Sequence, residues 1–311
     1  MTIQNGVYTP RGSACLEKAE LAFRDAMQAT FGPLDWLPIP DGTIHRFRVP
    51  DDKPGTLNGW YVLHLDGIAS GAFGSWKAGG SSTWSSRKPA DPMEAELIRQ
   101  RVEHAREQRE ADQTRRQIAT ASYAGTLWSD ARPAAPEHPY LTRKRIAPHR
   151  LRQRGDVLLV PLYADGYLCN LQRIAADGSK RFLSGGRVKG AYSPIGVLEP
   201  GQPLYVCEGW ATGATVHAET GAAVACAMNA GNLLEVGRQL QRHYPDSPLI
   251  IAGDDDRQTE AEGKGKGNPG RAAATQAAAV LGCGLVLPPF SADAPIDLSD
   301  FNDLANWRAV Q

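Results

Sequence analysis

Two stretches of the sequence decide the fold: Leu204-Tyr205-Val206-Cys207-Glu208-Gly209 and Leu249-Ile250-Ile251-Ala252-Gly253-Asp254-Asp255-Asp256. Each is a short apolar run, typical of a buried strand, that ends in acidic residues. The segments around them predict helices at 212–220, 233–243 and 270–281 and further strands at 222–227 and 284–287. Strands that alternate with helices at this spacing predict a parallel sheet with helices on its faces.

The two acidic strand ends are expected to meet, because active residues of such sheets lie just past the carboxyl ends of the strands. Carboxylates crowded at one edge repel each other unless a divalent cation lies between them, and hard oxygen ligands suit Mg²⁺ or Mn²⁺. Gly209 would let the chain turn sharply and let a substrate approach the backbone. A run of three aspartates taken alone favours a loop cap and solvated side chains. The pairing with the strand-terminal Glu208-Gly209 favours the metal site.

The order of these motifs resembles the Toprim domain, which DnaG-type primases, topoisomerases and some nucleases share. Glu208-Gly209 comes first, Asn229-Ala230-Gly231-Asn232 forms a turn of small residues, and Asp254-Asp255-Asp256 supplies an Asp-x-Asp pair. The segment 208–213 is similar to the EGYATA motif of plasmid and phage primases, with Trp210 for tyrosine and Gly213 for alanine. The resemblance implies Glu208 as a metal ligand or general base and Asp254 and Asp256 as metal ligands, and it leaves the role of Asp255 open.

A further acidic stretch, 297–304, resembles the DFNDL-like segment that follows the Toprim core in these primases. One interpretation gives Asp300 to the metal site as an additional carboxylate. The other makes Asp300 the N-cap of a helix that runs to about Trp307. The sequence does not choose between the two.

The region before the Toprim motifs, from Tyr140 to Gly190, is strongly basic and predicts strands at 157–160, 168–173 and 180–183. It is similar to the N-terminal part of the primase catalytic core. Gly185-Gly186 would allow a phosphate close to the backbone, and the basic side chains would bind phosphates. An ordinary basic surface explains the charge but not the glycines beside Arg187. The candidate nucleotide- and template-binding residues are Arg173, Lys180, Arg181, Arg187, Lys189, Gly209 and Asn229.

The loop at 263–271 is glycine- and lysine-rich and precedes a helix, yet it lacks the spacing of a phosphate-binding Walker loop. It could contact phosphates or be a surface loop, and its role stays open. No such loop occurs elsewhere, so any helicase that works with this chain is expected to be a separate protein.

The N-terminal region predicts a helix at 14–30 and an antiparallel module with strands within 43–76, followed by a loop at 79–86. Its basic and aromatic residues alternate, which suits a single strand whose bases stack on rings while cations meet the backbone. The candidate DNA-binding residues are Arg46, Trp60, Trp76 and Lys77, although a small module also needs tryptophans in its core. The five cysteines have no metal-ligand spacing, so zinc is not expected.

The whole chain has 311 residues, 42% of them hydrophobic, and no net charge. It contains neither a signal peptide nor an apolar run that could cross a membrane, and its scattered cysteines indicate a reducing cytoplasm. We expect an α+β or α/β protein in four parts. These are a zinc-free template-binding module (1–88), a long charged helical linker (89–135), the basic mixed β part of a primase core (136–198) and a Toprim domain with an acidic C-terminal segment (199–311).

Together these features predict a DNA primase that makes short RNA primers on single-stranded DNA from ribonucleoside triphosphates with two Mg²⁺ or Mn²⁺ ions, in plasmid, phage or mobile-element replication. A Toprim-type metal-dependent nuclease and a non-catalytic single-strand DNA-binding protein are the alternatives. The basic stretch before the Toprim motifs favours the primase.

Overall fold

A computed structural model describes residues 13–263 and 267–311. The glycine- and lysine-rich loop predicted at 263–271 therefore lies partly outside the described residues. The chain divides into two compact units, one ending at Thr114 and the other beginning at Arg115. The division falls inside the helix α2 (Pro92–Asp130). None of the described helices combines the length and the apolar character needed to cross a bilayer.

The first unit contains an antiparallel sheet with the strand order β1-β2-β3-β4, which confirms the predicted antiparallel module. The predicted loop at 79–86 is wrong, because Ser82–Ser85 pairs with β3 as an edge strand. Trp84 draws this segment onto the sheet, since its ring contacts that of Phe23 at a centroid distance of 5.4 Å. The strands are β1 (His45–Phe47), β2 (Gly59–His64), β3 (Ser70–Ser75) and β4 (Ser82–Ser85).

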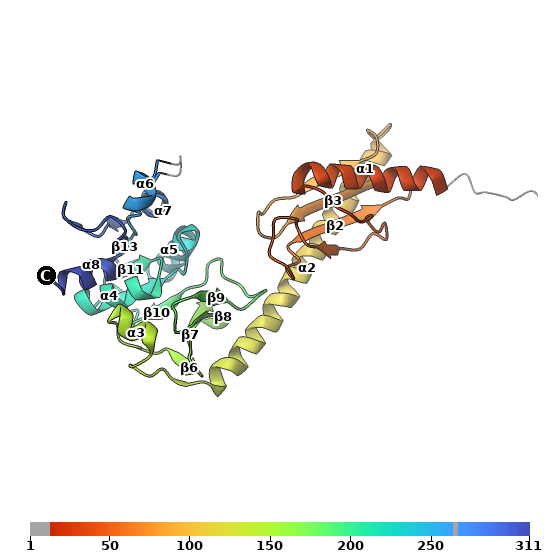
Figure 1. Cartoon of the computed structure of the whole chain (residues 1–311). Coiled ribbons are helices and arrows are strands. Elements are labelled where there is room, and N and C mark those ends of the chain that lie inside the picture. Colours follow the sequence, from red (N-terminus) through yellow and green to blue (C-terminus); the bar gives the residue numbers. More distant parts are fainter. Residues whose placement is uncertain (1–12, 264–266) are drawn as a thin grey trace, which may run out of the picture. The chain divides into compact units, whose positions relative to one another are not determined.

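Helices cover both faces of this sheet, as alternate side chains along each strand point to opposite faces. On one face, Phe23 of α1 (Ser13–Phe31) packs against Tyr61 and Phe73, and Figure 1 shows α1 lying across β2 and β3. On the other face, Trp60 packs with Ala105 of α2. Neither face is left open as a broad platform for a ligand.

The second unit begins with the basic β region, an antiparallel sheet with the strand order β5-β6-β7-β8-β9. The three predicted strands correspond to β7, β8 and β9, and the turns between them contain Asp165-Gly166 and Asp177-Gly178. The short helix α3 and the strands β5 and β6 have no counterpart in the predictions. The elements are β5 (Arg132–Pro133), α3 (Pro139–Lys144), β6 (Arg152–Arg154), β7 (Val157–Ala164), β8 (Tyr167–Ile174) and β9 (Lys180–Phe182).

The C-terminal sheet has the strand order β10-β12-β11-β13-β14. Strands β11 to β14 run parallel, as predicted. At one edge of the sheet, β10, for which the sequence predicts no strand, pairs with β12 in the antiparallel direction. The strands are β10 (Ser193–Ile195), β11 (Leu204–Cys207), β12 (Ala223–Cys226), β13 (Leu249–Ala252) and β14 (Gly284–Val286).

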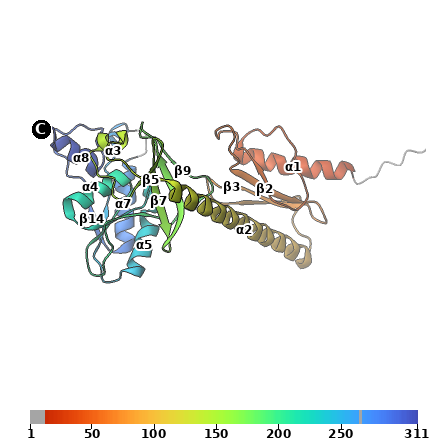
Figure 2. The ribbon, with the colours of Figure 1, turned by 90° about the horizontal axis from the view of Figure 1, so that it is seen from below.

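Helices lie on both faces of this sheet (Figure 2). Leu204 and Val206 of β11 belong to the core beneath α5 and α7. Cys207 points to the opposite face, where α4 packs together with apolar residues of α3, β7 and β8. The helical elements are α4 (Trp210–Thr220), the 3-10 turn η1 (Ala230–Asn232), α5 (Leu233–His243), α6 (Arg257–Ala261), α7 (Pro269–Leu281) and α8 (Phe301–Arg308).

A buried pair of cysteines explains why position 213 is glycine. Cys207 and Cys226 lie on adjacent strands with their sulfur atoms 3.8 Å apart, and α4 crosses above them. A Cβ on Gly213 would overlap the sulfur of Cys226 and lie 3.1 Å from that of Cys207. The departure from the alanine of the EGYATA motif therefore follows from the cysteines beneath the helix.

We expect Gly213→Ala to lower the free energy of unfolding by about 1–3 kcal/mol, because overpacking against Cys226 costs more than the gain in helix propensity. Gly125→Ala is the matched control, since it also lies in a helix but its Cβ would meet open space. That substitution is expected to stabilise by about 0.5–1 kcal/mol. Urea unfolding of both variants measures the difference, and equal effects of the two substitutions would contradict the overlap.

Candidate functional site

The carboxyl ends of β11 and β13 deliver Glu208 and Asp254 to the same edge of the sheet. The parallel register places Cys207 beside Ala252, so each acidic residue follows its strand at a similar level. The carbonyl of Glu208 accepts a hydrogen bond from the Met228 amide at 2.7 Å, which ties the end of β11 to the turn after β12. Met228 has a positive φ of 70° there, an uncommon conformation for a residue with a side chain.

The carboxylates at this edge repel one another, and this repulsion raises the pKa values of Asp254 and Glu208. Burial, followed by the charges of Asp300, Glu208 and Asp256, raises the pKa of Asp254 to about 8. Burial and Asp256 likewise raise the pKa of Glu208, although a hydrogen bond from the Ala230 amide and the charge of Lys180 oppose this. We call Glu208, Asp254, Asp256 and Asp300 the acidic edge.

Asp300 is the N-cap of a helix and also lies near the other carboxylates of the acidic edge. Its Oδ1 accepts a hydrogen bond from the Asp303 amide at 2.7 Å, so it is the N-cap of α8. Burial and the neighbouring Asp303 raise its pKa, and its charge is the largest single contribution of another residue to the pKa of Asp254. The cap therefore also places a carboxylate at the acidic edge.

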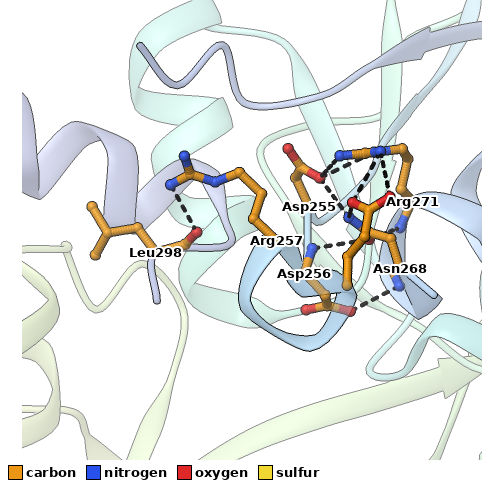
Figure 3. A network of polar contacts seen from close by, with 8 residues as sticks. Asp255, Asp256, Arg257, Asn268, Arg271 and Leu298 are labelled. Atoms are coloured by element: carbon orange, nitrogen blue, oxygen red, sulfur yellow. Dashed lines mark hydrogen bonds and ion pairs between the residues drawn. The ribbon is translucent and has the colours of Figure 1, made fainter. Parts of the chain in front are cut away.

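The two remaining aspartates of the run point in different directions (Figure 3). Asp255 is 9% exposed, and its Oδ1 accepts hydrogen bonds from Asn268 at 2.7 Å and from Arg271 at 2.6 Å. Asp256 accepts a hydrogen bond from the Gly270 amide at 2.8 Å, at the N-terminus of α7. Asp255 is thus committed to holding the loop against α7, which gives this residue a structural role.

Arg257 ties the same loop to the segment that leads to Asp300 (Figure 3). Its guanidinium lies 4.1 Å from the ring centroid of Phe290 and donates hydrogen bonds to the carbonyls of Pro295 and Leu298. The Asp255 amide also donates to the Ser299 carbonyl at 2.7 Å. These contacts fix the position of Asp300 relative to Asp254.

The residues of the acidic edge fit a divalent cation by their chemistry. Within the described part of the chain, no three histidine, cysteine or acidic side chains converge closely enough to form a preformed metal cage. However, Oδ1 of Asp254 is buried and has no hydrogen-bond partner there. A buried carboxylate oxygen without a partner is costly, and a hard cation would relieve both that cost and the mutual repulsion.

Lys180 is the candidate phosphate-binding residue that the structure brings to the acidic edge. It stands at the start of β9 and remains accessible to solvent. The protein around its ammonium nevertheless lowers its pKa by burial, and Lys144 lowers it further, whereas Asp300, Glu208 and Asp254 raise it. The ammonium therefore lies in the field of the carboxylates.

The other basic candidates lie at the surface of the basic β region. Arg173, Arg181 and Lys189 are exposed. Arg187 forms an ion pair with Asp165 at 3.0 Å. The largest contributions to the pKa shifts of Glu208, Asp254 and Asp300 come from burial and from other residues than these four.

The glycines require a revised explanation. Gly209 has a φ of −106°, which any residue adopts, so a sharp turn does not explain it and only access to the backbone remains. A Cβ on Gly186 would lie 2.5 Å from the Asn170 side chain, so packing already accounts for that glycine. Asn229 precedes η1 in an extended conformation with no side-chain cap bond.

Two buried asparagines that the sequence analysis missed join the basic β region to the C-terminal sheet. The side chain of Asn232 donates to the carbonyls of Val188, Ala191 and Ala227 at 2.9–3.0 Å and accepts from the Gly190 amide. Asn302 donates to the Lys144 carbonyl and to the Thr215 hydroxyl. A single asparagine in a sequence carries no mark of such long-range contacts.

The N-terminal candidates are largely engaged within their own unit. Trp60 is 3% exposed and cannot offer its ring face to a base, which corrects that expectation; it fills the core under α2. The guanidinium of Arg46 stacks over the partly buried Trp76 ring, 5.0 Å from its centroid. Lys77 is exposed and forms an ion pair with Asp52 at 2.7 Å.

Residues 203–308 match the Toprim domain family. Two DNA primases TraC of Escherichia coli are 35% and 36% identical to the chain over 263 and 264 residues. Each similarity covers 82% of this chain but only 24% and 18% of the relatives, so the chain spans a quarter or less of their length.

A solved structure resembles part of this chain with a lower sequence identity. It is a complex of the bacteriophage T7 lagging-strand DNA polymerase with primase domains of two gp4 subunits bound to an RNA/DNA hybrid. The TM-score is 0.37 at 14% identity, over 51% of this chain and 76% of the other.

The raised pKa of Asp254 makes the stability of the metal-free protein depend on pH. An unfolded aspartate titrates near about 4, whereas the folded one titrates at about 8. The folded state therefore holds the extra proton between these values, and stability falls as the pH rises through this window, by up to about 1.4 kcal/mol per pKa unit of difference. We expect Asp254→Asn to raise the Tm by several degrees at pH 8 and by little at pH 4.5.

Thermal unfolding in the presence of a chelator measures this difference. Asp246→Asn is the control, because Asp246 is exposed and precedes β13 at the opposite end of the strand. Adding Mg²⁺ at pH 8 is expected to raise the Tm of the wild type and to leave that of Asp254→Asn nearly unchanged. If the Tm difference between the wild type and Asp254→Asn were the same at pH 4.5 and at pH 8, the raised pKa of Asp254 would be refuted.

Proposed function

We propose that this chain, whose residues 203–308 form a Toprim domain, is a DNA primase that makes short RNA primers on single-stranded DNA by nucleotidyl transfer. The observation that carries the proposal is the acidic edge with the Lys180 ammonium in its field. A polymerase needs carboxylates for its cations and a positive charge for the triphosphate, and here both occur together. The similarity to DNA primases TraC supports the same activity.

The acidic edge would hold two Mg²⁺ or Mn²⁺ ions through Glu208, Asp254 and Asp256, with Asp300 as an additional ligand. When bound, such ions lower the pKa of the attacking 3′-hydroxyl and neutralise the charge of the leaving pyrophosphate. In the metal-free protein the pKa of Asp254, raised to about 8, keeps a proton at this edge, and the pKa values of Glu208 and Asp300 are shifted in the same direction. Binding of cations therefore releases protons, and activity is expected to rise with pH towards about 8.

The basic β region would position the nucleic acid and the nucleotide. Lys180 would meet the triphosphate, because its ammonium lies in the field of the carboxylates. The exposed Arg173, Arg181 and Lys189, together with Arg187, would bind the template backbone farther out. Gly209 and Asn229, just past β11 and β12, would border the nucleotide.

The proposed partners are a single-stranded DNA template, ribonucleoside triphosphates and a separate replicative helicase, in the replication of a plasmid, phage or mobile element. We propose template binding for the first unit as well, through Arg46, Trp76 and Lys77 rather than Trp60. Since helices cover both faces of its sheet, such binding would use side chains at the margins of the unit.

Incubation with single-stranded DNA, labelled ribonucleotides and Mg²⁺ or Mn²⁺ is expected to yield short RNA. We expect the double variant Asp254→Ala, Asp256→Ala to lose at least about 10³-fold in rate, because the cations lose their ligands. Asp246→Ala is the matched control and is expected to retain the rate of the wild type. Labelled products on a sequencing gel measure both.

Three other results of this assay would contradict the proposed primase activity or its site. RNA synthesis by the double variant at the rate of the wild type would show that the acidic edge takes no part in catalysis. Degradation of the DNA without synthesis would replace the primase by a Toprim-type nuclease. Binding of single-stranded DNA without either reaction would leave a non-catalytic DNA-binding protein.

A further inference from the structure

The ammonium of Lys180 rests on the ring of a buried tyrosine. Its Nζ lies 5.7 Å from the ring centroid of Tyr140, within the distance at which a cation is attracted to an aromatic face. Tyr140 belongs to α3 and is 2% exposed, so its ring has one fixed position. Neither the basic charge pattern nor the Toprim motifs point to this residue.

Contacts at the N-terminus of α3 hold Tyr140 in place. The Tyr140 amide donates to Nδ1 of His138, the N-cap residue, and Nε2 of His138 lies 2.8 Å from the Asp156 carbonyl. Within the unit the ring joins the core that also contains Trp210 and Cys207, directly beneath the acidic edge. Tyr140 thus connects α3 to the strand end that carries Glu208.

The turn before β9 packs on the same helix. A Cβ on Gly178 would lie 3.7 Å from the Tyr140 ring and 2.6 Å from the Arg143 guanidinium. Gly178 also has a positive φ of 89°, which favours glycine. Because Lys180 follows this turn by two residues, the backbone that carries Lys180 is fixed relative to the ring.

A lysine at this place needs such a support. Its side chain rotates about four bonds, and fixing them costs up to about 2 kcal/mol of rotamer entropy. The carboxylates of Glu208, Asp254 and Asp300 attract the ammonium, while Lys144 repels it. Without a fixed surface, the ammonium would collapse onto a carboxylate that the cations require or turn into solvent.

We propose that Tyr140 is a positioning residue, whose ring face holds the Lys180 ammonium beside the acidic edge so that it meets the incoming triphosphate. The inference rests on the proposed function of this site. It assigns the role to the ring and not to the hydroxyl. The Tyr140 hydroxyl is buried and, among the described residues, has no hydrogen-bond partner.

A double-mutant cycle tests the proposal with Tyr140→Leu, Lys180→Met and the combination of both. Two quantities are measured: the KM for ribonucleotides in primer synthesis and the Kd of a fluorescent ATP analogue in the presence of Mg²⁺. Tyr140→Leu is expected to raise both about five-fold, the size of a partly desolvated cation–π contact, with kcat and the Kd for single-stranded DNA changed less than about two-fold. The combined variant is expected to bind the analogue no more weakly than Lys180→Met alone.

The conservative variant Tyr140→Phe separates the ring from the hydroxyl and serves as the control for folding. It keeps the aromatic face and is expected to show the KM and the Kd of the wild type. Loss of affinity in Tyr140→Phe equal to that in Tyr140→Leu would transfer the role to the hydroxyl and overturn the proposal. If Tyr140→Leu does not fold, Tyr140→Met, whose longer and unbranched side chain adapts better to the space of the ring, replaces it in the cycle.

Additive effects of the two substitutions on the Kd would also overturn the proposal, because they would show that Tyr140 acts through the general packing of the core. The cycle remains informative if the proposed primase activity fails, since the ATP analogue reports binding without synthesis. Synthesis of RNA together with an additive cycle would reject the positioning role alone. Absence of synthesis together with a non-additive cycle would reject the primase activity alone.

Discussion

Repulsion among buried carboxylates is the constraint on which the rest of the second unit depends. Asp254 carries a buried oxygen without a hydrogen-bond partner among the described residues, and the charges of four further carboxylates raise its pKa. In the absence of cations this arrangement costs stability, because a carboxylate gains nothing from burial unless it is paired or protonated. The surrounding structure must therefore hold the loops in place against that repulsion.

The contacts around the acidic edge supply this restraint. The Asp255 carboxylate accepts hydrogen bonds from Asn268 and Arg271, which fastens the loop to α7. Arg257 fastens the segment that leads to Asp300. On the side of the basic β region, Lys144 forms an ion pair with Asp303 at 3.0 Å and opposes the rise in the pKa of Asp300. Positively charged side chains thus bind the residues around the acidic edge.

Much of the fold could be predicted from the sequence because its signals are local. Short apolar runs ended by Glu208 and Asp254 define parallel strands, and Asp-Gly turns at 165–166 and 177–178 define hairpins. The edge strands β4 and β10 could not be predicted, since Ser82–Ser85 is polar and Ser193–Ile195 is only three residues long. Their pairing is decided by tertiary contacts, such as the packing of Trp84 on Phe23, that no local pattern encodes.

The candidate site divides in the same way. The acidic residues stand at strand ends, so their meeting follows from topology. Which basic residue approaches them does not follow, because β9, α3 and the acidic edge are far apart in the sequence. The position of Lys180 distinguishes it from Arg173 and Arg181, because Lys180 follows the turn at Gly178, which packs on α3. The predicted boundary between residues 198 and 199 separates segments that share one hydrophobic core, which includes Tyr140 and Leu158 on one side and Trp210 and Ala252 on the other.

That shared core explains how a basic and an acidic segment can form one site. If the two segments folded separately, the charges on each would be placed by mobile linkers, and the distance between an ammonium and a carboxylate would vary by several ångströms. Packing them into one core, with Asn232 and Asn302 joining their backbones, fixes this distance by the same contacts that stabilise the unit. A close-packed interior resists small displacements. The relative position of Lys180 and Asp254 is therefore set by core residues such as Tyr140 as much as by the charged groups themselves.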